Sequence, residues 1–137
     1  MTSPLRIGFA GYGYWGPNIL RNLDRLPGAT VVAACDTQPA NLAKLQAAYP
    51  HIATTESLTA LLADYDLDAV VVATSAPTHA ELARRVLEAG LHCYVEKPLT
   101  LASADAKHLV NLATAGDRVL MVGHLMVYHA AVDWIAD

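Results

Sequence analysis

Short apolar runs alternate along this chain with longer segments in which apolar residues recur every three or four positions. An apolar run predicts a strand covered on both faces, and the helical spacing predicts an amphipathic helix. The predicted strands are residues 5–10, 30–35, 69–73, 92–95 and 119–122. The predicted helices are residues 17–25, 39–49, 57–63, 77–88 and 103–115. Ser57 suits a helix N-cap, and Gly90 suits a helix C-terminal stop.

This alternation predicts an α/β fold, a Rossmann-type doubly wound parallel sheet with helices on both faces. Ligands of such sheets bind at the carboxyl ends of the strands, where the strand order reverses. The polar segments at those ends are residues 11–16, 36, 74–79, 96–98 and 123–124. We therefore expect these segments to surround one cleft.

The first loop carries the spacing Gly11-x-Gly13-x-x-Gly16 between a predicted strand and a predicted helix. Gly11 permits a tight turn, Gly13 lets the backbone approach a pyrophosphate, and Gly16 lets the helix pack close to the sheet. Glycines also occur in ordinary turns, which is the structural alternative. The order strand, glycines, helix, strand and acid favours dinucleotide binding.

The acid of this pattern is Asp36, which ends the second predicted strand 20 positions after Gly16. A carboxylate at this spacing accepts hydrogen bonds from the adenosine ribose hydroxyls. Its charge repels a 2′-phosphate, and the following Thr37 and Gln38 supply no arginine to neutralise one. The sequence therefore predicts NAD as the cofactor, with NADP less favoured.

Glu96, Lys97 and Pro98 directly follow the predicted strand 92–95. A partly buried Lys97 beside a bound nicotinamide could exchange a proton with a substrate oxygen while a hydride moves, so it is the candidate catalytic residue. Glu96 could orient the ammonium group and contact the cofactor. A solvated lysine–glutamate pair at a strand end is the alternative.

Further candidates lie at the same strand ends. Tyr14 and Trp15 could line the cofactor cleft, whereas packing against the sheet is the preferred reading for Tyr12. The alternative for Tyr14 and Trp15 is likewise packing. Thr74 and Ser75 could reach the nicotinamide ribose, or cap the next helix, or do both.

Three histidines and a tyrosine complete the candidate set. His79 could touch the cofactor or be structural. His124 ends a predicted strand at the cleft, so it could meet substrate or cofactor. Tyr128 and His129 are candidate sugar contacts. No pair of histidines has the spacing of a metal site, so we expect no metal.

The composition limits the function classes. The 137 residues are 54% hydrophobic and 16% charged, which indicates one globular domain and not a disordered chain. A net charge of −4 without a basic cluster argues against nucleic acid as the partner. The apolar runs are too short to span a membrane. Cys35 and Cys93 lie in predicted strands and have no pairing pattern, so we expect buried thiols in a reducing compartment, the cytoplasm.

Four motifs, at residues 11–18, 73–79, 96–99 and 122–124, resemble those of the Gfo/Idh/MocA oxidoreductases in the same order. Residues 14–18 and 125–129 look most like the subgroup that acts on nucleotide sugars. The resemblance implies an NAD(P)-binding Rossmann domain, which we assign to residues 1–124, and a C-terminal α+β substrate domain with an open mixed sheet. It implies that Lys97 corresponds to the family's lysine that assists proton transfer. It also implies oxidation of a sugar or cyclitol secondary alcohol, or the reverse reduction.

This chain departs from the family in two ways. Residues 125–137 would only begin the crossover into the substrate domain, which normally supplies a catalytic histidine, and Ala130 stands where the subgroup has proline. We therefore expect little or no turnover from this chain alone. Exposed apolar residues between 125 and 135 would favour self-association into a homo-oligomer.

Two other function classes stay open from the sequence. A non-catalytic module would bind NAD without hydride transfer. A Rossmann-like methyltransferase would bind S-adenosylmethionine, although it gives no reason for the residues 96–98.

Overall fold

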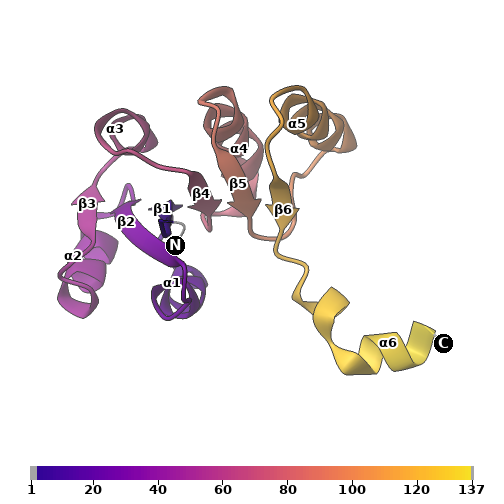
Figure 1. Ribbon diagram of the computed structural model, residues 1–137, viewed down its shortest axis with the longest axis horizontal. Helices are drawn as coiled ribbons and strands as arrows, with labels where there is room; N and C mark the ends of the chain where they lie inside the picture. Colours follow the sequence, from indigo (N-terminus) through magenta and orange to yellow (C-terminus); the bar gives the residue numbers. More distant parts are fainter. Residues whose placement is uncertain (1–2, 137) are drawn as a thin grey trace.

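The computed structural model describes residues 3–136 and contains a six-stranded sheet in which all neighbouring strands are parallel (Figure 1). The strand order is β3-β2-β1-β4-β5-β6. The strands are β1 (Leu5–Ala10), β2 (Ala29–Cys35), β3 (Ala53–Thr55), β4 (Ala69–Val72), β5 (His92–Val95) and β6 (Leu120–Val122). The α-helices are α1 (Gly16–Asp24), α2 (Pro39–Ala48), α3 (Leu58–Asp64), α4 (His79–Glu88), α5 (Ser103–Ala115) and α6 (Ala130–Ala136). Two 3-10 helices are η1 (Ala76–Thr78) and η2 (Leu125–Tyr128).

Helices cover both faces of the sheet, which confirms the predicted doubly wound architecture. In Figure 1, α1 and α2 lie below the sheet, and α3, α4 and α5 lie above it. The strand order reverses at β1, because the chain runs outward through β2 to β3 and then returns to place β4 on the other side of β1. The segments that follow β1 and β4 therefore diverge to opposite faces, which opens a crevice between them.

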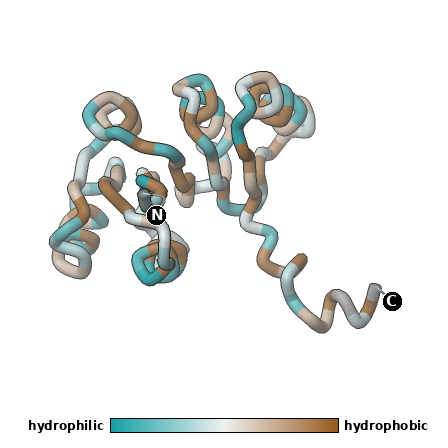
Figure 2. The backbone as a smooth tube through the Cα atoms, in the orientation of Figure 1, coloured by the Kyte–Doolittle hydropathy of each residue, from teal (hydrophilic) through white to brown (hydrophobic). Residues whose placement is uncertain are grey.

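Each layer of helices encloses its own apolar core, because side chains alternate between the two faces along a strand. Phe9 of β1 is buried on the same side as Leu20 of α1 and Leu45 of α2. Val70 and Val72 of β4 are buried on the opposite side, among residues of α3, α4 and α5. Figure 2 shows hydrophobic residues following the strands between these layers. The strands are thus apolar in sequence because both of their faces are covered.

All the predicted strands and helices are present, with small differences at their ends. The predicted N-cap is confirmed, because Ser57 Oγ accepts a hydrogen bond from the Ala60 N–H at 3.1 Å. The predicted stop at Gly90 is confirmed by its left-handed φ of 77°. The helix predicted over 77–88 differs at its start, where the 3-10 turn η1 precedes α4.

Three elements were not predicted from the sequence. The strand β3 has only three residues and no apolar run, and it forms by pairing with β2 at the sheet edge. The helices η2 and α6 fall in the segment predicted as the start of a crossover. That segment, 125–137, ends at a residue that lies outside the described part of the chain.

The segment of η2 and α6 extends away from the sheet in Figure 1. The exposed apolar residues expected there are present: Leu125, Met126, Val127, Tyr128, Trp134 and Ile135. Self-association through them stays a prediction. Over residues 3–136, no helix combines the length and apolar character needed to cross a membrane. Within the same residues, no three His, Cys, Asp or Glu side chains are grouped to hold a metal ion.

Candidate functional site

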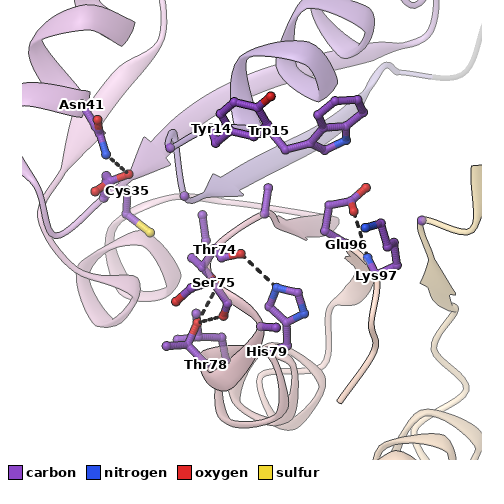
Figure 3. A pocket seen from close by; sticks show the side chains of 18 of the residues that line it. Tyr14, Trp15, Cys35, Asn41, Thr74, Ser75, Thr78, His79, Glu96 and Lys97 are labelled. Atoms are coloured by element: carbon purple, nitrogen blue, oxygen red, sulfur yellow. Dashed lines mark hydrogen bonds between the residues drawn. The ribbon is translucent and has the colours of Figure 1, made fainter. Parts of the chain in front are cut away.

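A cleft of about 1250 Å³ lies at the carboxyl ends of the strands (Figure 3). Most of the predicted site residues line it: Gly11, Gly13, Tyr14, Trp15, Asp36, Thr74, Ser75, His79, Glu96, Lys97 and His124. Three predicted site residues do not line this cleft. Gly16 is buried behind the first loop, Tyr128 borders a shallower hollow beside β6, and His129 follows η2.

The three glycines of the first loop have different surroundings. Gly11 has a left-handed φ of 97°, and a Cβ there would lie 2.7 Å from the Thr74 nitrogen. A Cβ on Gly16 would collide with the Gly11 carbonyl oxygen. A Cβ on Gly13 would meet no other atom within 4 Å. The fold therefore requires Gly11 and Gly16, whereas Gly13 leaves open space on the cleft side of the loop.

The aromatic residues of this loop lie on different sides of it. Tyr12 is buried in the core beside Phe9 and Leu20, which confirms the packing expected for it. Tyr14 is 96% exposed and Trp15 is 40% exposed, and both line the cleft. Figure 3 places both rings on the same wall of the cleft, across from Thr74 and His79.

The Asp36 carboxylate receives three hydrogen bonds. Its Oδ2 accepts from the Tyr12 N–H at 2.8 Å and from Asn41 Nδ2 at 3.1 Å. Its Oδ1 accepts from the Gln38 N–H at 2.8 Å. The acid therefore joins the glycine loop to the start of α2, and its position is fixed by groups of the protein.

The loop after β4 is organised by its own hydroxyl groups. Thr74 Oγ1 and Thr78 Oγ1 are 2.7 Å apart, and Thr78 Oγ1 donates to the Ser75 carbonyl at 2.8 Å. Ser75 stands at the N-cap position of η1, but its side chain makes no capping hydrogen bond. The capping alternative is therefore wrong for Ser75, and its hydroxyl is free of that role.

His79 is only 1% exposed although it lines the cleft. Its Nδ1 lies 2.7 Å from the Pro98 carbonyl oxygen, and its Nε2 lies 3.0 Å from the Thr74 carbonyl oxygen. The ring therefore bridges the loop after β4 and the loop after β5. The structural role considered for His79 is present in this geometry.

Glu96 and Lys97 differ sharply in their surroundings. Lys97 is exposed, so the partial burial expected for it is wrong. Glu96 is 7% exposed, and its Oε2 accepts from the Lys97 backbone N–H at 3.0 Å. Its Oε1 is buried and has no hydrogen-bond partner within residues 3–136. An acceptor of this kind suits a donor group that enters the cleft.

Tyr94 and Gly123 confine the Glu96 carboxylate. Burial and the neighbouring Glu96 raise the pKa of the Tyr94 phenol. A Cβ on Gly123 would collide with the Tyr94 hydroxyl and would lie 2.7 Å from Glu96 Oε1. A glycine at the end of β6 therefore makes room for this buried acid.

Several cleft residues were not predicted from the sequence: Cys35, Thr37, Gln38, Asn41, Glu56, Met126 and Val127. Burial first, and the neighbouring Asp36 second, raise the pKa of the Cys35 thiol to about 12. The cysteine is therefore part of the wall and not a reactive group. The sequence did contain one indication that Asn41 belongs to the site, namely its position shortly after Asp36. A polar residue in the first turn of a helix can face the end of the strand that precedes the helix.

The cleft can hold an extended anionic ligand. The open backbone at Gly13, the start of α1 and the fixed Asp36 lie on the side of β1 and β2, whereas Glu96 and Lys97 lie at the end of β5. A diphosphate at a helix start is favoured by the free N–H groups there. These features define a dinucleotide-binding Rossmann domain.

Comparisons with known proteins agree with this class. The family described as "Oxidoreductase family, NAD-binding Rossmann fold" matches residues 5–124. UDP-N-acetylglucosamine 3-dehydrogenase of Acidithiobacillus ferrooxidans is 38% identical over 79 residues, which are 58% of this chain and 25% of that relative.

Two solved structures are also similar. The WlbA dehydrogenase of Bordetella pertussis in complex with NADH and UDP-GlcNAcA is 30% identical with a TM-score of 0.83, over 89% of this chain and 35% of that chain. Biliverdin reductase of Synechocystis in complex with biliverdin and NADP+ is 29% identical with a TM-score of 0.86, over 92% and 40% of the respective chains.

This chain belongs to the Gfo/Idh/MocA family of NAD(P)-dependent oxidoreductases and comprises its NAD-binding Rossmann domain. The family resemblance expected from the four motifs is therefore confirmed, and the methyltransferase alternative is wrong. The chain spans from 25% to 42% of the length of curated relatives that it matches.

Proposed function

We propose that this chain is the cofactor-binding part of an NAD-dependent dehydrogenase that transfers a hydride between nicotinamide and a secondary alcohol of a sugar or nucleotide sugar. One observation carries the proposal. A single cleft contains an open glycine backbone at Gly13, a fixed carboxylate at Asp36 and a lysine at Lys97. These groups come from the ends of β1, β2 and β5, so the sheet itself sets their separation.

The cofactor-binding residues would contact different parts of the dinucleotide. The loop with Gly11, Gly13 and Gly16 would hold the pyrophosphate, and Asp36 would accept hydrogen bonds from the adenosine ribose. The remaining cofactor contacts would be Tyr14, Trp15, Thr74, Ser75, His79, Glu96 and Lys97. The buried Glu96 carboxylate supports this division, because it places acceptor oxygens in the cleft lining at the nicotinamide end.

Lys97 would carry the proton transfer. Bound NAD would supply the hydride acceptor at its nicotinamide ring. As the alcohol becomes a carbonyl, Lys97 Nζ would take the hydroxyl proton and pass it to solvent, and in the reverse reduction it would return that proton. The position of Lys97 supports this role, because the residue lines the cleft at the end of β5.

The substrate class is inferred from the relatives. These relatives include a UDP-N-acetylglucosamine 3-dehydrogenase and a dehydrogenase in complex with UDP-GlcNAcA, which support a nucleotide sugar as the substrate. His124 would contact substrate or cofactor from the end of β6, and Tyr128 and His129 would contact the sugar.

Residues 1–124 would form the Rossmann domain, and residues 125–137 would begin the crossover to a substrate domain. The free, buried thiols of Cys35 and Cys93 support a cytoplasmic location.

Calorimetric titration of the 137-residue chain with NAD, NADP and S-adenosylmethionine tests the binding part of this proposal. We expect NAD to bind more tightly than NADP. We expect S-adenosylmethionine to give no heat of binding. Absence of NAD binding would refute the proposal. An affinity for NADP equal to that for NAD would refute the predicted preference.

Catalysis is tested in the protein that carries this chain, with a panel of nucleotide sugars and NADH absorbance as the readout. Lys97→Met should lower kcat by about 10²- to 10⁴-fold, the usual contribution of a positioned acid or base, while NAD affinity stays nearly constant. Lys107→Met, at an exposed position of α5, is the matched control and should leave kcat unchanged. Turnover that survives Lys97→Met would remove the catalytic role, and NAD binding without hydride transfer to any sugar would favour the non-catalytic module.

A further inference from the structure

The Asp36 carboxylate is held by donors from both sides of the adenosine end of the cleft. The Tyr12 N–H comes from the glycine loop, and the Gln38 N–H comes from the residue before α2. Asn41 supplies the third donor, and it is a side chain. A substitution can therefore remove the Asn41 hydrogen bond while both backbone donors remain.

Asn41 reaches the carboxylate because α2 starts at Pro39, which places Asn41 in the first helical turn. Side chains on a helix lean toward its N-terminus, and here that direction leads back to the end of β2. Figure 3 shows the Asn41 amide directed at an oxygen of the neighbouring acid. Asparagine forms helices less readily than alanine or leucine, so the residue is not explained by helix propensity.

The immediate surroundings of Asp36 contain no counter-charge for a phosphate. Among the described residues that line the cleft, Lys97 is the one lysine or arginine, and it lies at the end of β5. Glu56, which follows β3, adds a second carboxylate to the lining near Asp36. A 2′-phosphate on the adenosine ribose could be accommodated only if Asp36 turned away, and that movement would break its hydrogen bonds.

We propose that Asn41 is a positioning residue that holds Asp36 toward the ribose and thereby determines how strongly the cleft prefers a free 2′-hydroxyl over a 2′-phosphate. The inference rests on the proposed function, because it presupposes that Asp36 faces the adenosine ribose. Asn41 restricts the rotation of the carboxylate. Its loss would weaken the hold on the ribose hydroxyls and would allow Asp36 to move aside for a phosphate.

The test measures the affinities of this chain for NAD and NADP by calorimetry. Asn41→Leu keeps the branched shape of the side chain and lacks the amide donor. We expect the ratio of the NADP to the NAD dissociation constant to fall about tenfold, the effect of one hydrogen bond to a charged group. Asn22→Leu is the matched control, because the Asn22 amide donates to the Asn18 carbonyl at 2.9 Å on the exposed side of α1. It should leave the ratio unchanged.

A second arm separates positioning from a general structural effect. Asp36→Asn should lower the ratio, and Asn41→Leu should cause no further fall in that background, because the two residues act through one carboxylate. An unchanged ratio in Asn41→Leu, whatever its melting temperature, would overturn the inference and leave the proposed function intact. If the unmodified chain binds neither dinucleotide, the proposed function itself is refuted.

Discussion

Gly13 and Gly16 belong to one sequence motif, yet the structure predicts opposite consequences when each is replaced by alanine. A Cβ on Gly16 would collide with the Gly11 carbonyl oxygen, which is a backbone atom and cannot move without displacing the loop. A Cβ on Gly13 would meet no other atom within 4 Å, and the φ of Gly13 is not left-handed. Gly16→Ala should therefore damage the fold, and Gly13→Ala should damage the binding of the ligand.

The magnitudes follow from these contacts. Overpacking a tight site costs about 1–3 kcal/mol, and contact with a rigid carbonyl places Gly16→Ala near ~3 kcal/mol. In a domain of this size that loss lowers Tm by about 10 °C. Gly13→Ala should raise the free energy of unfolding by about 0.5 kcal/mol, because alanine restricts the unfolded chain. It should weaken NAD binding at least about tenfold, because a methyl group would hold the diphosphate away from the backbone N–H groups.

Thermal unfolding and calorimetric titration of both variants measure these effects. Gly28→Ala is a useful control, because Gly28 has a left-handed φ of 84° and does not line the cleft. It should cost about 1 kcal/mol of stability and leave NAD binding unchanged. Wild-type NAD affinity in Gly13→Ala would show that no ligand approaches the backbone there, and wild-type Tm in Gly16→Ala would show that the loop absorbs the extra methyl group.

Two further predictions concern buried groups. Burial raises the pKa of the Cys35 and Cys93 thiols to about 12, so at pH 8 both should react with a disulfide reagent only after unfolding. Because the folded state favours the protonated thiols, their contribution to the free energy of unfolding is complete below pH 9. Between pH 9 and 12 this contribution should be lost, by up to about 1.4 kcal/mol per pH unit for each thiol. Urea unfolding followed across that pH range measures the loss. His79→Leu should lower the free energy of unfolding in urea by about 1–3 kcal/mol, because it removes the buried ring that lies within hydrogen-bond distance of the Thr74 and Pro98 carbonyl oxygens. A loss below about 0.5 kcal/mol would show that water replaces the ring.

The sequence was sufficient for the layers of the fold because the central strands β1, β2, β4 and β5 are largely buried and each main helix has a recognisable start or stop. Leu5–Ala10 could be read directly as an apolar run, and Ser57 as a cap. Ala53–Thr55 could not, because a three-residue edge strand depends on its partner β2 for hydrogen bonds and not on its own composition. The segment 125–136 has apolar residues without a clear period, so its helices were not predicted.

The candidate site was predictable where a residue serves a ligand through its backbone or its charge. Gly13, Asp36 and Lys97 fall in this group, because their spacing relative to the strands carries the information. Asn41 and Gly123 could not be predicted in this way. Asn41 matters through its hydrogen bond to Asp36, and Gly123 matters through the space that it leaves beside Glu96. The burial of Glu96 beside an exposed Lys97 also required three dimensions, because adjacent residues at a strand end point in different directions.

The reversal of strand order at β1 means that the cleft at the carboxyl ends of the strands arises from the route of the main chain and not from any one side chain. Substitutions can therefore accumulate over most of the molecule without closing it. The Synechocystis biliverdin reductase and the Bordetella pertussis WlbA dehydrogenase share this backbone with the chain at about 30% identity, and their structures hold NADP+ and NADH, respectively. A change of cofactor preference in such a protein would act at the loops that follow the strands, while the scaffold beneath them keeps its course.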